Sequence, residues 1–328
     1  MSIIEFHSSK DLELVESLVL DLCDPQEKVN ALSELRKKRG MFKDLAPMLW
    51  YSFGTMAALL QEVVLVYPTL SSPTLSANAS SRVCNALGLL QTVAAHLVTR
   101  TPFLAARILL YLYPFLNTTS KAKSYEYLRL ASLHVIDALV KVDDTEAVNF
   151  LVTSQVIPLC LRIMETDSEL PKLVATSIVK RIMLDEFGLQ YICATADRFF
   201  QAAMALATMV NALAEQPSAR LLKHVVRCYL RLTDNPRALA ALQICLPNPL
   251  KDGAFDNCLQ DDPATRCCLQ QLLDNLGAPA GGGAPRPGAG GPAAAGGGAR
   301  HPGPGPAARG SRGGGSSSQA GPSRAPWM

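Results

Sequence analysis

Tyr-Pro-Phe-Leu at residues 113–116 and Ile-Pro-Leu-Cys at residues 157–160 are two versions of one pattern. Each is followed by a polar turn and then by a long apolar segment, which ends at Asp143 in the first copy and at Asp185 in the second. The two prolines are 44 residues apart and the two aspartates are 42 residues apart. This nearly equal spacing indicates an internal repeat.

The sequence around this repeat predicts an all-α protein. Up to residue 276, apolar residues recur every three or four positions, and the alternation typical of strands is absent. The expected helices include residues 76–98, 102–116, 123–141 and 218–233. Helical repeats of about 40–47 residues are typical of armadillo and HEAT proteins. We therefore predict an armadillo-type helical-repeat solenoid with a curved binding surface.

The composition changes at the end of this helical region. From Gly277 to Met328 the chain consists mainly of Gly, Pro, Ala and Ser, which bury too little apolar surface to fold. We predict an armadillo-repeat domain at residues 1–276 and a disordered tail at residues 277–328. The whole chain carries +3 and the tail's five arginines carry +5, so the domain carries −2. The tail's Arg-Gly pairs suit either nonspecific RNA contact or a solubilising linker.

No targeting or membrane segment is evident. Acidic residues begin at Glu5, which excludes a signal or transit peptide, and no apolar run approaches about 18 residues. The nine cysteines lack metal-binding spacing, as expected of small core residues in a reducing compartment. These features predict a cytoplasmic and nuclear protein without membrane attachment.

Motifs for catalysis are missing from residues 1–276. No Gly-rich phosphate loop, nucleophile elbow or Cys-x-x-Cys pair occurs there. His224 and Cys228, one helical turn apart, have the spacing of half a zinc site or of a nucleophile with its base. Because no second pair lies nearby in the sequence, we interpret them as structural. The sequence thus predicts a protein that is not an enzyme and holds no metal or cofactor.

Residues 217–237 predict a helix with two different faces. Ser218 is a favoured N-cap residue, and Asp-Asn-Pro at residues 234–236 is a stop signal. Between them the basic residues share one face, namely Arg220, Lys223 or His224, Arg227 and Arg231. This basic ridge is either a solvated helix face or a binding surface for phosphates and aromatic rings. In a solenoid, Arg198, Arg220 and Arg237 would converge on the concave face from successive repeats.

Several blocks of the sequence resemble the Rcd/Caf-forty family, whose members are the armadillo subunits of the CCR–NOT deadenylase complex. The resemblance extends over roughly residues 10–275 and leaves the tail outside. The blocks that carry it are residues 44–50 (Asp-Leu-Ala-Pro-Met-Leu-Trp), 52–55, 57–62, 82–87, 126–130, 157–165 and 217–232.

This resemblance implies a six-repeat armadillo adaptor without catalytic activity. It implies docking to the NOT scaffold subunit through Tyr51, Phe53, Ala57 and Val64. It implies a surface for short helical peptides at Val174, and a cleft for tryptophans or nucleic acid at Arg198, Arg220, Arg237 and Ala241. The implied partners are the scaffold subunit, mRNA-bound regulators such as silencing proteins with Gly-Trp repeats, single-stranded nucleic acid, and a second copy of the free protein.

Two positions depart from the family pattern. Tyr51 stands where the family has a histidine, and an aromatic ring still packs there. Ala196 stands where the family has a tyrosine, so this chain lacks an aromatic ring at that position on which an indole would stack. Scaffold docking is therefore better supported than tryptophan capture. The alternative function is direct binding of single-stranded nucleic acid by the arginine cleft and the Arg-Gly tail.

Overall fold

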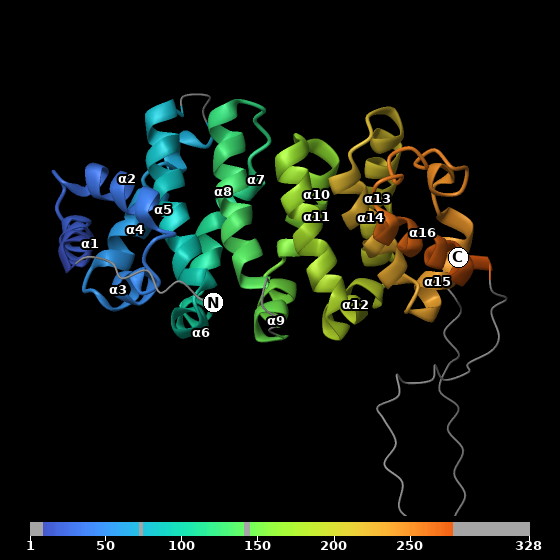
Figure 1. The fold of residues 1–328 in the computed structure, drawn as a ribbon, viewed down its shortest axis with the longest axis horizontal. Helices are drawn as coiled ribbons and strands as arrows, with labels where there is room; N and C mark the ends of the chain where they lie inside the picture. The colour runs from blue at the N-terminus through green and yellow to red at the C-terminus, as the bar shows by residue number, and fades with distance from the viewer. Residues whose placement is uncertain (1–8, 72–74, 141–144, 278–328) are drawn as a thin grey trace, which may run out of the picture. The chain divides into compact units, whose positions relative to one another are not determined.

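The computed structural model describes residues 9–71, 75–140 and 145–277, and all regular structure in these ranges is helical (Figure 1). The all-α prediction is therefore confirmed. Asp143 and the predicted tail lie outside the described residues, except for Gly277, which ends the last helix.

The first half of the described chain contains α1 (Ser9–Asp21), α2 (Lys28–Lys38), α3 (Leu45–Tyr51), α4 (Thr55–Val64), η1 (Tyr67–Thr69), α5 (Ala77–Ala95), α6 (Leu97–Ala105), η2 (Ile108–Leu112), α7 (Tyr113–Asn117) and α8 (Lys123–Val140). The second half contains α9 (Thr145–Thr153), α10 (Val156–Thr166), α11 (Glu169–Leu184), α12 (Glu186–Cys193), α13 (Ala196–Glu215), α14 (Ala219–Leu232), α15 (Pro236–Cys245), η3 (Asn248–Leu250) and α16 (Pro263–Gly277).

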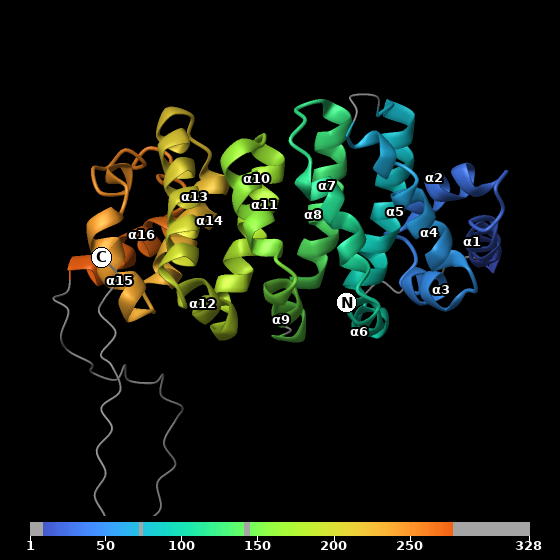
Figure 2. The ribbon, with the colours of Figure 1, turned by 180° about the vertical axis from the view of Figure 1, so that it is seen from behind.

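The helices stack in chain order, as Figures 1 and 2 show from opposite sides. One row consists of helices that each pack against the next, namely α2, α5, α8, α11, α14 and α16. A second row, which includes α7, α10 and α13, packs less closely. The stack therefore bends with the first row, which we call the inner row, on the concave side.

The repeat found in the sequence corresponds to this stacking. Pro114 lies in α7 and Pro158 in α10, and the long helices that follow them are α8 and α11 of the inner row. Neighbouring repeats are joined by hydrogen bonds between residues about one repeat apart. Ser80 donates to the carbonyl of Ser124, 44 positions on, and Arg162 donates to the carbonyl of Leu116, 46 positions back.

Two expected helices were wrong in their extent. Residues 102–116 are divided among α6, η2 and α7, and Arg107 between α6 and η2 has a φ of 52°. Residues 76–98 form α5 only to Ala95, because His96 has an extended backbone (φ −87°, ψ 133°). The Nδ1 atom of His96 accepts a hydrogen bond from the backbone N–H of Val98 and so caps α6. The Thr99 hydroxyl donates to the carbonyl of Val93 at 2.6 Å and holds the corner closed. No Gly or Pro marks this break in the sequence.

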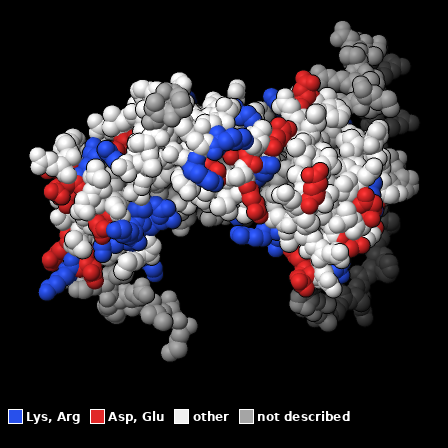
Figure 3. Space-filling view, turned by 90° about the horizontal axis from the view of Figure 1, so that it is seen from above, with Lys and Arg blue, Asp and Glu red and all other residues white. Residues whose placement is uncertain are grey.

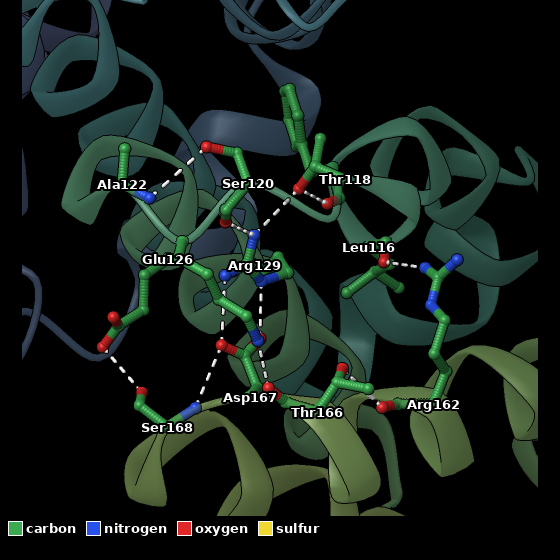
Figure 4. A network of polar contacts seen from close by, with 12 residues as sticks. Leu116, Thr118, Ser120, Ala122, Glu126, Arg129, Arg162, Thr166, Asp167 and Ser168 are labelled. Atoms are coloured by element: carbon green, nitrogen blue, oxygen red, sulfur yellow. Dashed lines mark hydrogen bonds and ion pairs between the residues drawn. The ribbon is translucent and has the colours of Figure 1, made fainter. Parts of the chain in front are cut away.

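A buried ion pair joins α8 to the end of α10 (Figure 4). The Arg129 guanidinium donates to both carboxylate oxygens of Asp167, at 2.5 and 3.0 Å, and its side chain is only 2% exposed. Its remaining nitrogen donates to the Thr118 hydroxyl and to the carbonyl of Ser120. A forked arginine suits such two-point contact with a carboxylate, so this network fixes the spacing of two repeats.

The described residues contain no single membrane-spanning helix and no group of side chains arranged as a metal site. None of their helices is by itself long and apolar enough to cross a membrane, although two bent helix pairs reach that length and composition when joined. Within the same residues, no group of three or more His, Cys, Asp or Glu side chains is arranged to hold a metal ion.

Candidate functional site

The corner between α3 and α4 projects an aromatic ring into solvent. Phe53 is 100% exposed in the turn of residues 52–54. Gly54 has a φ of 79°, which favours glycine, and a Cβ there would lie 3.1 Å from the Sγ of Cys23. The Cys23 thiol donates to the carbonyl of Phe53 at 3.6 Å. The local sequence thus holds the Phe53 backbone while its ring remains outside the core.

The side chains around Phe53 extend this apolar surface. Ala57 and Val64 are seven residues apart on α4 and share its outer face, whereas Ala58, Leu59 and Val63 are buried. The exposed apolar residues here, which we call the docking patch, are Tyr51, Phe53, Ala57, Val64 and Leu65. Leu65, which is 59% exposed, was not expected from the sequence because it belongs to the apolar run of residues 63–66. Large exposed apolar patches are typical of interaction sites.

A groove runs along the inner row between α5 and α8. It has a volume of about 490 Å³, and Tyr127, Leu130 and Ala131 form part of one wall. At its other side Arg36 of α2 lies over Gly88, where the missing Cβ leaves room for the guanidinium group. Val174 is half-buried on the next inner helix, α11, and lies outside the residues that line the groove.

The predicted division of α14 into two faces is confirmed, but the basic ridge is not uniformly free. The apolar residues from Leu221 to Leu232 are buried except for the half-buried Leu230, and the basic residues keep partial exposure. Arg231, at the end of the helix, pairs with Glu186 at 3.0 Å and Asp234 at 2.7 Å. Ser218 occupies the N-cap position, yet its hydroxyl bonds to the carboxylate of Glu169 instead of capping the helix.

His224 lies in the middle of the basic ridge of α14, close to several cations. Its Nδ1 atom is buried without a hydrogen-bond partner among the described residues. Burial, followed by the charges of Lys180, Arg227, Lys223 and Arg181, lowers the pKa of His224 to about 4. Burial also lowers the pKa of Lys180, and the neighbouring Arg181 acts in the same direction. Helices α11 and α14 therefore concentrate positive charge between them.

This environment of His224 predicts an acid-dependent loss of stability. The unfolded chain takes up a proton at an ordinary pKa near 6.5, whereas the folded chain does so only near 4. Stability therefore falls as the pH drops from about 6.5 to 4, by at most about 1.4 kcal/mol per pH unit and by less because solvent screens the ring. The His224→Gln variant should lose less stability than the wild type in urea unfolding between pH 7 and pH 4.5. Identical pH profiles would contradict the assignment.

Arg198, Arg220 and Arg237, which were expected to converge, do not all lie at the same end of the pair of helices α13 and α14. The Tyr229 hydroxyl contacts the carbonyl of Ala203, so α13 and α14 run antiparallel. Arg198, at the start of α13, therefore lies at the same end as Arg237, at the start of α15. Arg220 lies near the end of α13, about 25 Å away at 1.5 Å per residue. The structure thus places Arg198 and Arg237 at one end of this pair and Arg220 at the other.

The end of the pair that holds Arg198 also holds an aromatic ring. The Arg198 guanidinium lies 3.9 Å from the ring centroid of Tyr191 on α12. Tyr191 was not expected from the sequence, because it is seven residues from Arg198 and on another helix. Ala196 is half-buried at the start of α13, and Ala241 is a buried residue of α15. Arg198 and Tyr191 together form a stacked surface of the type that binds aromatic rings.

The sulfur of the His224–Cys228 pair is inaccessible. Cys228 is fully buried, and burial raises the pKa of its thiol to about 12. A thiol that stays protonated is a poor nucleophile and a poor metal ligand. The geometry therefore agrees with a structural role for both residues.

Comparison with known structures identifies the fold. The chain is similar to a designed armadillo repeat protein with a TM-score of 0.58 and 17% identity, over 80% of this chain and 99% of that one. A second designed armadillo repeat protein, solved in complex with the peptide (KR)4, gives the same TM-score at 16% identity, with the same coverage. The armadillo-type fold predicted from the repeat spacing is confirmed.

Sequence comparison identifies the family. The chain is 55% identical to cell differentiation protein rcd1 of Schizosaccharomyces pombe over 263 residues. The aligned region covers 80% of this chain and 93% of the relative. It is 53% identical to protein CAF40 of Saccharomyces cerevisiae over 251 residues, and this aligned region covers 76% of this chain and 67% of the relative. The Rcd1-like cell differentiation family matches residues 18–276. This chain therefore belongs to the Rcd1-like cell differentiation family.

Proposed function

We propose that this chain is a noncatalytic adaptor subunit of the CCR–NOT mRNA deadenylation complex. Family membership supports the assignment, because the resemblance described above places the family in that complex. The observation that carries it is the complete exposure of Phe53 within the docking patch. A ring that is fully exposed in the free chain buries a large apolar area when a partner covers it.

The chemistry of the docking patch suits a helical scaffold. Ala57 is a small exposed residue on the same face of α4 as Val64 and so leaves a shallow site there, which fits the ridge of a packed helix. Gln61, which lies on the same face of α4 between Ala57 and Val64, is exposed and accepts a hydrogen bond from Lys28. Protein interfaces usually combine apolar contacts with such hydrogen-bonding groups.

The same proposal assigns the recruitment of regulators to the other surfaces. Val174 and the inner row would bind short helical motifs of proteins that control mRNA decay, translational repression and transcription. Arg198 stacked on Tyr191 would contact tryptophan-containing motifs. Such a subunit acts in the cytoplasm and the nucleus.

Substitution of Ala57 by tyrosine tests the docking patch. The added ring would fill the shallow site and hold the scaffold helix away from Phe53. We expect binding to the purified NOT scaffold subunit to weaken by about 30-fold or more, because loss of an interface hot spot costs upwards of 2 kcal/mol. Isothermal titration calorimetry measures the affinity, and circular dichroism verifies that the helices and the melting temperature are retained.

A matched control places the same ring elsewhere. Ala214 is exposed on α13, so the Ala214→Tyr variant should bind the scaffold as the wild type does. Wild-type affinity in the Ala57→Tyr variant would show that the scaffold does not use this surface.

A further inference from the structure

The inner face of α11 and α14 carries four cations from two neighbouring helices. On α14 the residues that remain partly exposed include Lys223 and Arg227, one turn apart. Helix α11 packs against α14 and carries Lys180, which is buried, and Arg181, which is half-buried; both charges, like those of Lys223 and Arg227, act on His224. We call these four residues the α11–α14 cluster. Seen from above, Lys and Arg atoms border the hollowed side of the body (Figure 3).

Only part of this charge is neutralised within the described chain. Arg181 has Asp137 of α8 at 3.9 Å, and Lys223 has Asp262 at 3.9 Å. Neither Lys180 nor Arg227 forms an ion pair with any of the described residues. Two acidic residues therefore face four cations, and the positive stretch is confined to two packed helices whose axes lie about 10 Å apart.

We propose that the α11–α14 cluster binds the carboxylates of an acidic polypeptide segment. The inference rests on the proposed adaptor function in so far as the ligand is part of a protein partner. It goes further in naming the chemistry of that partner and in placing the contact on residues other than Val174.

Two observations favour a polypeptide over a nucleic acid. Surfaces for single strands combine cations with exposed aromatic rings on which bases stack. Tyr229 is the only Phe, Tyr or Trp on α11 and α14, and it is 1% exposed. The carboxylates of Asp137 and Asp262 also interrupt any longer track for a phosphate backbone. A few glutamates of a short segment fit the confined positive stretch.

The neighbouring apolar position specifies the segment further. Val174 and Arg181 are seven residues apart on α11 and share one face of that helix. A partner that contacts both therefore carries an apolar side chain and, about 10 Å further on, an acidic one. This is the pattern of an acidic amphipathic helix.

The test uses the full chain and two fluorescein-labelled peptides. One is a 15-residue helical peptide of Glu, Ala and Leu, and the other carries Gln at every Glu. We expect the Glu peptide to bind at least about tenfold more tightly at low salt, and the Lys223→Gln/Arg227→Gln variant to lose about tenfold for the Glu peptide alone. A matched variant, Lys43→Gln/Lys251→Gln, removes the same charge from exposed positions elsewhere and should retain wild-type affinity.

The protonation of His224 gives an independent readout at the cluster. An anion bound there offsets the cations that face the ring from α11 and α14, so an NMR titration should show a higher pKa for His224 with the Glu peptide than with the Gln peptide. An unchanged pKa for His224, or an equal loss of affinity in both double variants, would overturn the proposal.

Further outcomes separate this inference from the proposed function. If a dT15 oligonucleotide binds more tightly than the Glu peptide and depends on Lys223 and Arg227, the cluster is a nucleic-acid surface and the inference is wrong. Normal scaffold binding without discrimination between the peptides would refute the inference and leave the adaptor function intact. Peptide discrimination without scaffold binding would refute the adaptor function alone.

Discussion

Replacement of Arg129 by methionine is expected to lower the midpoint of thermal unfolding by roughly 10 °C, since removal of one partner from a buried ion pair costs about 3–5 kcal/mol. The reason is the burial of Asp167, whose side chain is 5% exposed and would keep a carboxylate without its arginine. The hydroxyl of Thr118 and the carbonyl of Ser120 would lose their donor as well. Differential scanning calorimetry of the purified protein measures the shift.

A second substitution separates lost pairing from lost packing. In the Arg129→Met/Asp167→Leu variant no buried charge remains, so most of the stability should return. The Lys37→Met variant, which breaks an exposed pair with Glu34, should melt as the wild type does. If the double variant is no more stable than Arg129→Met, the network stabilises through shape and not through charge.

Substitution of Gly188 by alanine should be almost as damaging. Gly188 lies in the first turn of α12, and its N–H donates to the Asp185 side chain that caps the helix. A Cβ at this position would overlap the backbone carbonyl of Ile182 in the last turn of α11, and helix backbone does not yield as a flexible side chain does. We expect a loss of about 3 kcal/mol or more in urea unfolding, because overpacking of a rigid contact forces the helices apart.

Gly88 provides the matched comparison. A Cβ there would meet the side chain of Arg36, which is flexible and borders an open groove. The Gly88→Ala variant also gains helix propensity of up to about 1 kcal/mol, so we expect its stability to remain close to that of the wild type. Equal destabilisation by both substitutions would show that backbone contact at Gly188 is not the cause.

The helices and their repeat could be predicted from the sequence because both depend on local spacing. The helix expected at residues 218–233 is α14 (Ala219–Leu232), and its apolar face is buried as predicted. The break at His96 could not be predicted, because a histidine capping a helix leaves no composition signal. Phe53 was named through the family resemblance, and the structure adds that its side chain is fully exposed.

The candidate sites were harder to predict because their members are far apart in the sequence. Arg231 seemed a free member of the basic ridge, but its partner Glu186 is 45 residues away. Lys180 lies near the cations of α14 only because its own helix, α11, packs against α14. Arg198 and Arg220 are separated by the length of α13. That distance could be worked out only once α14 was known to run antiparallel to α13.

The short reach of the polar contacts between repeats bears on how the chain folds during its synthesis. The hydrogen bonds that join repeats here span from 33 residues, between Thr176 and Met209, to 56 residues, between Tyr125 and Thr69. At about 5–20 residues per second, the partner of each repeat leaves the ribosome within roughly ten seconds. Each new repeat therefore meets a folded template, and the solenoid grows from its N-terminal end without waiting for the C-terminal residues.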